Sequence, residues 1–309
     1  MTTATAARVI ESATLPTAVW SDWSCLVRLV VSDPQALTPA VAQLGSLMRR
    51  VDRVASRFRI DSELNWANAN AGRPVAISAT LAELVDTALG EASRSNGCLD
   101  PTVGADLRRL GYDRDIALVS DSEDAVVEHS GPRPTWRDVG LDLFAGLLTV
   151  PPHSSLDLGA SAKAHTADLA AAALHRRFGC DVLVEIGGDL AVAGRLRPWQ
   201  VTVAERAGRQ GQQVSLHEGG LATSSTRIRR WWRGDQEVNH IVDPGTGRPA
   251  EGIWRTVSVA ARTATHANTC STTAIVLGDE ALAWLHDQRV AARLVDRDGL
   301  VVTIGDWPG

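Results

Sequence analysis

The order in which apolar patterns follow one another constrains the fold of this chain more than any other feature. Before residue 180, apolar residues recur every three or four positions over long stretches, which is typical of amphipathic helices. After it, short apolar runs bounded by turn residues follow one another, which is typical of strands. Because helices and strands come in groups rather than in regular alternation, the pattern predicts an α+β fold with a mainly antiparallel sheet and packed helices.

Three helices can be bounded in the first part of the chain. The longest has one apolar face, formed by Leu37, Val41, Leu44, Leu47, Val51, Val54 and Phe58. A second is expected at 79–95, where Asn96-Gly97 ends it. An Ala-rich third runs from about Ser161 to Gly179, a residue suited to a helix C-terminus.

Strands are expected where short apolar runs lie between turn residues. The first is Cys25–Val31, and the others are 182–186, 199–204, 237–242, 256–261, 291–296 and 299–304. Two short helices, 267–275 and 279–287, interrupt this series.

The chain shows no sign of a linker between domains. Residues 1–18 are expected to form a flexible N-terminal arm and residues 19–309 a single domain. The N-terminal residues lack the basic-then-apolar pattern of a signal peptide, and no apolar run is long enough to span a bilayer. We therefore expect a cytoplasmic protein without an integral membrane segment.

Composition argues against several classes of function. The net charge of −5 disfavours a nucleic-acid-binding surface, which needs concentrated positive charge. The four cysteines are far apart in the sequence, so neither a zinc site nor a disulfide framework is indicated. No Gly-rich phosphate loop or dinucleotide-binding fingerprint follows the first strand.

One loop has the features of a strand-end active site. His240 ends a strand-like run, and Asp243-Pro244 and the turn 245–247 follow it. Histidine can transfer a proton near neutral pH, and Asp243 can hydrogen-bond the turn. Polar side chains on such loops build many active sites.

Two segments with small residues suit a phosphate. In 157–164, the start of a helix favours an anion and Lys163 adds a positive charge, although an ordinary helix cap with a solvated lysine fits equally well. Asp168 either reaches a sugar hydroxyl or is solvated. Gly187-Gly188, at a strand end, indicates a sharp turn or close contact with a ligand.

Oxygen-bearing side chains gather in two further segments. Residues 222–226 are a hydroxyl cluster that suits a phosphate, a flavin edge or a plain turn. Asn268 and Thr272 are four apart and so share one face of a helix. Two oxygen donors there fit Mg²⁺, whereas a helix cap explains the same residues.

Taken in order, these segments resemble the ApbE-type flavin transferase family, the FAD:protein FMN transferases. The resemblance runs over residues 49–285, about three-quarters of the chain. Each piece alone is weakly specific, but seven occur in the right order: 56–64 with Asn68, 97–104, 157–168, 186–189, 222–225, 240–249 and 267–272.

The resemblance implies a specific reaction. Members of the family bind FAD and Mg²⁺, transfer the FMN half of FAD to a Thr or Ser hydroxyl of a target protein, and release AMP. By residue match, the metal would be held by the Ala160 carbonyl, Asn268 and Thr272. The FAD site would contain Ala160, Lys163, Asp168, Gly187, Gly188, Thr223, Ser224, His240 and Ile241. Lys163 and His240 are the candidate catalytic residues, with His240 as the base.

The chain departs from the family pattern at three places. Asn268 stands where the family has Asp, residues 20–24 stand in place of a Met-Gly-Thr segment, and Ser225 replaces a glycine. A neutral amide should bind Mg²⁺ less tightly than a carboxylate. Two alternatives therefore stand beside transfer: an FAD-binding carrier or regulatory protein, and a pyrophosphatase that yields FMN and AMP.

Overall fold

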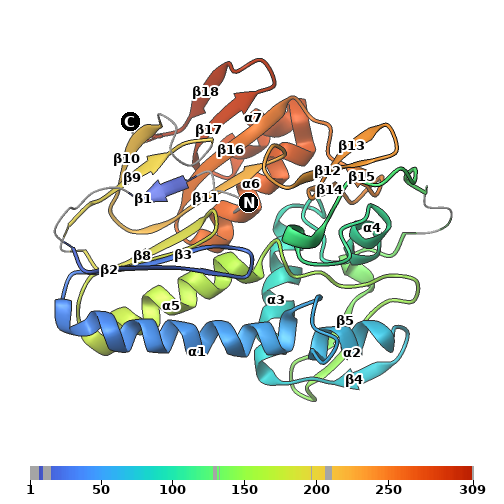
Figure 1. Cartoon of the computed structure of the whole chain (residues 1–309), viewed down its shortest axis with the longest axis horizontal. Helices are drawn as coiled ribbons and strands as arrows, with labels where there is room; N and C mark the ends of the chain where they lie inside the picture. The colour runs from blue at the N-terminus through green and yellow to red at the C-terminus, as the bar shows by residue number, and fades with distance from the viewer. Residues whose placement is uncertain are drawn as a thin grey trace. The chain divides into compact units, whose positions relative to one another are not determined.

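An eight-stranded sheet dominates the computed structural model, and every neighbouring pair of its strands is antiparallel (Figure 1). In spatial order its strands are β18 (Val301–Ile304), β17 (Ala291–Asp296), β16 (Trp254–Ala261), β11 (Gly219–Ser225), β8 (Asp189–Ala193), β7 (Val182–Ile186), β3 (Cys25–Val31) and β2 (Thr17–Asp22). The predicted α+β fold with a mainly antiparallel sheet is confirmed.

The structure describes residues 7–9, 15–127, 131, 133–195, 197–205 and 211–307. The chain divides into two compact units. Unit 1 consists of Met1–Leu47, Lys163–Ile228 and Gly252–Gly309, and unit 2 of Met48–Ala162 and Arg229–Glu251. The large sheet belongs to unit 1. The single domain predicted for residues 19–309 stays a prediction beside this division.

Four of the described helices lie wholly or partly in unit 1. Helix α1 (Leu37–Ala55), which follows the short η1 (Pro34–Ala36), lies beside α5 (Ala162–Phe178), since Arg177 donates a hydrogen bond of 2.9 Å to Gln43. Helix α6 (Ala264–Leu277) packs against β11 and β16, and α7 (Ala281–Asp287), which follows η4 (Gly278–Glu280), packs against α6. Among the described residues, no helix combines the length and apolarity needed to cross a membrane.

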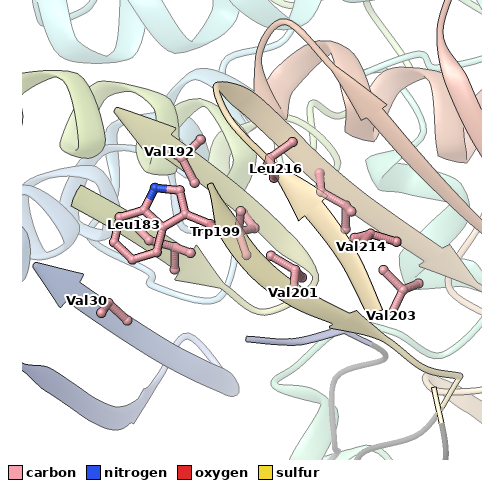
Figure 2. Packing of buried hydrophobic residues seen from close by; sticks show 10 residues of the cluster. Val30, Leu183, Val192, Trp199, Val201, Val203, Val214 and Leu216 are labelled. Atoms are coloured by element: carbon pink, nitrogen blue, oxygen red, sulfur yellow. The ribbon is translucent and has the colours of Figure 1, made fainter. Parts of the chain in front are cut away.

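A second sheet of unit 1 covers part of the core. It consists of β1 (Ala7–Val9), β9 (Trp199–Val203) and β10 (Gln212–Leu216). Figure 2 shows side chains from this sheet gathered with those from the large sheet, Trp199 and Leu183 among them. The cluster contains Val30, Leu183, Leu190, Val192, Trp199, Val201, Val203, Val214, Leu216 and Leu221. Burying these apolar side chains is the main force that holds the two sheets together.

Unit 2 combines the long helix α3 with several short elements. Its helices are α2 (Glu63–Ala69), α3 (Ala79–Arg94) and α4 (Gly104–Arg109), with the shorter η2 (Ile116–Leu118) and η3 (Trp136–Asp138). Its strands are β4 (Pro74–Ala76), β5 (Gly140–Asp142) and β6 (Leu147–Thr149) in one sheet, and the hairpins β12 (Arg230–Arg233) with β13 (Gln236–Asn239) and β14 (Val242–Asp243) with β15 (Arg248–Pro249).

Most predicted elements are present with small shifts in their bounds, and the helix ends have the predicted cause. Helix α3 ends where Asn96 and Gly97 adopt positive φ, and the Gly97 N–H donates to the Ala92 carbonyl at 2.7 Å. Helix α5 ends at Phe178, and Gly179 follows it with φ +64° and an N–H that donates to the His175 carbonyl at 2.8 Å. Both are left-handed C-terminal caps.

Two element predictions were wrong in detail. The apolar face that begins at Leu37 does not extend to Phe58, because α1 ends at Ala55 and the Phe58 ring instead packs against Tyr112, with 5.7 Å between ring centroids. The strand expected at 237–242 is divided at His240, because β13 pairs with β12 whereas Val242 pairs with Pro249 of β15.

Part of the predicted N-terminal arm is paired backbone. Ala7–Val9 form β1 against β9, and residues 17 and 18 begin β2 against β3. Residues 1–6 and 10–14 of that arm lie outside the described residues.

Candidate functional site

The glycine pair of unit 1 forms the two-residue turn between β7 and β8. Ile186 pairs with Asp189 across it, and the Gly187 N–H donates to the Leu26 carbonyl at 2.8 Å. Gly187 has φ +69°, a conformation that L-residues with a Cβ rarely adopt. The predicted sharp turn is therefore confirmed.

Lys163 passes beside this turn. It lies in the first turn of α5, and its Cε is 3.9 Å from the point where a Cβ on Gly187 would lie. The side chain is partly buried, and the start of the helix adds its own positive partial charge. This corner of unit 1 therefore combines a lysine, a helix N-terminus and a side-chain-free turn.

The hydroxyls of β11 face two different neighbours. Successive residues of a strand point to opposite faces. Thr223 hydrogen-bonds Ser258 of β16 at 2.8 Å, and its N–H donates to the Gly188 carbonyl at 3.1 Å. Ser224 hydrogen-bonds Ser271 and Thr272 of α6, both at 2.8 Å. Ser224 therefore belongs to the face that contacts α6, and Thr223 anchors the glycine turn.

Proton counting assigns the direction of the hydroxyl bonds around Ser224. Ser271 Oγ donates to the backbone carbonyl of Asn268 at 3.1 Å, so its only hydrogen is used there. Ser224 must then donate to Ser271, and Thr272 must donate to Ser224. The hydrogen of Thr272 is thereby directed at Ser224, which leaves the lone pairs of Thr272 Oγ1 free to face a cation.

Asn268 presents a second oxygen on the same face of α6. It is 8% exposed, and its Nδ2 donates to Asp189 Oδ1 at 2.7 Å. Its Oδ1 is buried and makes no hydrogen bond with the described residues. A buried amide oxygen without a partner is costly, and an amide and a hydroxyl oxygen are donors that Mg²⁺ accepts. These residues therefore fit a magnesium ion.

The fit depends on neutral donors. In the part of the chain that the structure describes, no group of three or more His, Cys, Asp or Glu residues is placed to hold a metal ion. Any cation at Asn268 and Thr272 would be bound by carbonyl and hydroxyl oxygens, as the sequence prediction has it.

Asp168 accepts hydrogen bonds from the N-terminus of α6. Its Oδ1 accepts from the Ala264 N–H at 2.8 Å, and its Oδ2 accepts from the N–H and hydroxyl of Thr265 at 2.9 and 2.7 Å. Burial raises the pKa of Asp168, although these hydrogen bonds act in the opposite direction. The carboxylate thus joins α5 to α6. Contact with a sugar hydroxyl, one of the two expectations for Asp168, stays a prediction.

His240 and Ile241 lie in unit 2, where the chain leaves β13 for β14. The His240 N–H donates to the Arg229 carbonyl at 3.2 Å, and the Ile241 N–H donates to Asn239 Oδ1 at 2.9 Å. Asp243 accepts from the Gly245 N–H and the Thr246 hydroxyl, both at 2.9 Å, as predicted for this turn. The loop is therefore fixed by its own backbone contacts.

Ala160 lies in the exposed end of the loop before α5, also in unit 2. Asp157 holds this loop, since its Oδ1 accepts from the Gly159 N–H at 2.7 Å and its Oδ2 forms an ion pair with Arg57. The Arg57 guanidinium lies over the rings of Phe58 and Tyr112, 4.2 and 4.3 Å from their centroids. A cation held in this way gives Asp157 a fixed partner.

The structure gathers one group of the predicted residues within unit 1: Lys163, Gly187, Gly188, Thr223, Ser224, Asn268 and Thr272. Ala160, His240 and Ile241 belong to unit 2. Sequence reasoning assigned no role to Asp189, which contacts Asn268, or to Arg57, which holds Asp157. The signal for Asp189 was present, because it is an acidic residue directly after the glycine turn.

Comparison with known proteins gives a consistent result. The model of the ApbE family matches residues 22–294. The chain is 32% identical over 284 residues to the FAD:protein FMN transferase of Treponema pallidum, covering 83% of this chain and 76% of that protein. It is 33% identical to the FAD:protein FMN transferase of Rhodobacter capsulatus, covering 85% of this chain and 50% of that protein. The crystal structure of the ApbE protein from Thermotoga maritima has the same fold, with a TM-score of 0.82, 23% identity, and coverage of 95% of this chain and 97% of that one.

Proposed function

This chain belongs to the ApbE family, and we propose that it transfers the FMN half of FAD to a Thr or Ser hydroxyl of a target protein, releases AMP, and depends on Mg²⁺. Relatives named FAD:protein FMN transferase support the reaction. The observation that carries the magnesium requirement is the buried Asn268 Oδ1, which has no hydrogen-bond partner among the described residues.

The proposed roles follow from the chemistry of each group. The Ala160 carbonyl, Asn268 and Thr272 would hold Mg²⁺, which when bound would offset negative charge on the pyrophosphate. Lys163 would place a further positive charge there. The other groups proposed for the FAD site are Asp168, Gly187, Gly188, Thr223, Ser224 and Ile241.

The proposed transfer exchanges one phosphorus–oxygen bond for another. The target hydroxyl attacks the phosphorus of the FMN half, the bond to the bridging oxygen breaks, and AMP leaves with that oxygen. The hydroxyl proton must be accepted, and His240 is the proposed base. Such proton transfer typically contributes about 10² to 10⁴ in rate.

A mass-spectrometric assay tests the reaction directly. A peptide with one Ser or Thr is incubated with the full chain, FAD and Mg²⁺, and we expect a peptide that carries the mass of FMN, together with free AMP. Free FMN and AMP with an unmodified peptide would instead indicate a pyrophosphatase. Bound FAD without either product would indicate a carrier or regulatory protein.

Two variants connect the assay to His240. His240→Ala should slow transfer by about 10² to 10⁴ while FAD stays bound. His286→Ala is the control, because its side chain is 87% exposed on α7 and should leave transfer unchanged. Transfer at the wild-type rate in His240→Ala would exclude His240 as the base.

The proposed partners are FAD and a flavin-accepting target protein, without nucleic acid. A cytoplasmic location is the expectation from sequence, and fractionation of cells that express the chain would test it.

A further inference from the structure

The buried carboxylate of Asp189 is fixed next to the proposed metal ligand Asn268. Asp189 is 2% exposed and starts β8 directly after the glycine turn. Its backbone is held on both sides, since Asp189 pairs with Ile186 of β7 and with Ala222 of β11. A side chain on such a backbone has little freedom to move away from α6.

The contact between Asp189 and Asn268 determines how the Asn268 amide is turned. Asn268 Nδ2 donates to Asp189 Oδ1 at 2.7 Å, which places the NH₂ group of the amide on the side of Asp189. The carbonyl oxygen of the amide therefore faces away from Asp189. This orientation leaves Oδ1 without a hydrogen bond among the described residues.

The charge of the site is the second consideration. The three groups proposed to bind Mg²⁺ are a backbone carbonyl, an amide and a hydroxyl, and none of them carries a charge. These protein ligands therefore supply no charge of their own to offset that of a divalent cation before FAD brings its pyrophosphate. Asp189 places a negative charge one hydrogen bond from the amide ligand and polarises that amide toward the cation.

We propose that Asp189 is a positioning residue for the metal site, which both orients the Asn268 carbonyl oxygen toward the cation and supplies the negative charge that the ligands lack. This inference rests on the proposed function for the identity of the metal, but it is measured by binding and not by transfer.

The test compares Mn²⁺ affinity among full-length variants, with Mn²⁺ as a paramagnetic probe for the magnesium site. Free Mn²⁺ is measured by electron paramagnetic resonance, with and without FAD. Asp189→Asn keeps the shape and an acceptor oxygen but removes the charge, and should weaken Mn²⁺ binding by about 10- to 100-fold. The exchange variant Asp189→Asn/Asn268→Asp restores one carboxylate to the pair and should recover most of the affinity.

Asp181→Asn is the matched control. Asp181 is 1% exposed and precedes β7, at the strand end opposite the glycine turn. Removal of this equally buried carboxylate should leave Mn²⁺ affinity unchanged. The rise in melting temperature that Mg²⁺ produces gives a second measurement, and it should shrink in Asp189→Asn but not in Asp181→Asn.

Each possible result supports or rejects the proposed role of Asp189. Wild-type affinity in Asp189→Asn, an exchange variant that folds but stays weak, or no Mn²⁺ binding by the wild type would overturn the inference. Mn²⁺ binding with the expected pattern but without FMN transfer would leave the inference standing and reject the transferase function. If the wild type transfers FMN but binds Mn²⁺ no more tightly than Asp189→Asn, the inference is rejected and the transferase function stands.

Discussion

At the scale of single residues, the hydrogen bonds among the hydroxyls of Ser271, Ser224 and Thr272 determine which way the lone pairs of Thr272 Oγ1 face. Ser271 donates to the backbone carbonyl of Asn268, Ser224 donates to Ser271, and Thr272 donates to Ser224. None of these side chains is charged, yet together they turn the lone pairs of Thr272 away from β11. Ser224 would thus affect the proposed metal site through Thr272, without being a ligand itself.

Ser224→Ala should weaken Mn²⁺ binding, because the freed Thr272 hydrogen can rotate toward the cation position. We expect a loss of up to about 10-fold, measured by the same resonance titration. Ser225→Ala is the matched control, since Ser225 is also buried but hydrogen-bonds Arg255 and Thr256 of β16. Equal losses in both variants would contradict the assignment.

Residues of this kind show the limit of sequence reasoning. Asn268 and Thr272 could be paired from their spacing, because a helix places positions four apart on one face. Asp189 and Asp168 could not be given their partners, because these contacts join residues 79 and 96 positions apart. Such contacts depend on which strands and helices become neighbours, and local pattern does not encode that.

At the scale of elements, the β7–β8 turn is tight because both of its residues are glycines. Positive φ at Gly187 lets the strands reverse within two residues and leaves room for the Lys163 stem. The sequence predicted this turn and the long helices well, because Gly-Gly and regular apolar spacing are local signals. The sequence predicted one strand over 237–242, because nothing in the local pattern indicates that the pairing partner changes from β12 to β15 at His240.

Gly187→Ala tests what this turn contributes. Gly179→Ala is the matched control, because Gly179 has a similar φ of +64° but open space around a Cβ, whereas a Cβ on Gly187 would contact Cys25 and Lys163. Both variants should lose about 1–2 kcal/mol of unfolding free energy in urea, the cost of left-handed backbone. Only Gly187→Ala should also slow FMN transfer, and equal transfer rates would contradict a role for the turn.

The link between α5 and α6 gives a prediction about pH. Because burial raises the pKa of Asp168 above its ordinary 3.8, the folded protein holds this proton to higher pH than the unfolded chain. The stabilisation from Asp168 is therefore complete below its ordinary pKa and is lost as the pH rises through the raised value. When the pH rises from about 4 to about 7, the unfolding free energy of Asp168→Asn should fall by less than that of the wild type. Urea denaturation at both pH values measures this, and equal losses would contradict it.

At the scale of the whole molecule, three separate stretches of chain build unit 1 and two build unit 2. The sequence predicted the fold class because helices and strands come in groups. It did not predict the interleaving, because no linker or change in composition marks the points where the chain leaves one unit for the other. Residues 47 and 48, for example, lie inside the continuous helix α1.

The stability of the whole chain should respond to its ligands. A ligand that binds only the folded state adds about 2.7 kcal/mol at 100 times its Kd. FAD with Mg²⁺ should therefore raise the melting temperature more than FAD alone, and a chelator should remove the difference. Asn268→Ala should keep the shift caused by FAD and lose the part caused by Mg²⁺. A Mg²⁺ effect of wild-type size in that variant would argue against Asn268 as a ligand.

The order of strands in the large sheet also has a consequence for synthesis of the chain. Val31 of β3 pairs with Val182 of β7, so the β2–β3 hairpin leaves the ribosome long before its partner strand exists. At ordinary translation rates, the intervening 150 or so residues take roughly 8 to 30 s. During this time the edge of β3 is unpaired and able to pair with other chains. The nascent protein should therefore depend on chaperones more than its finished fold suggests.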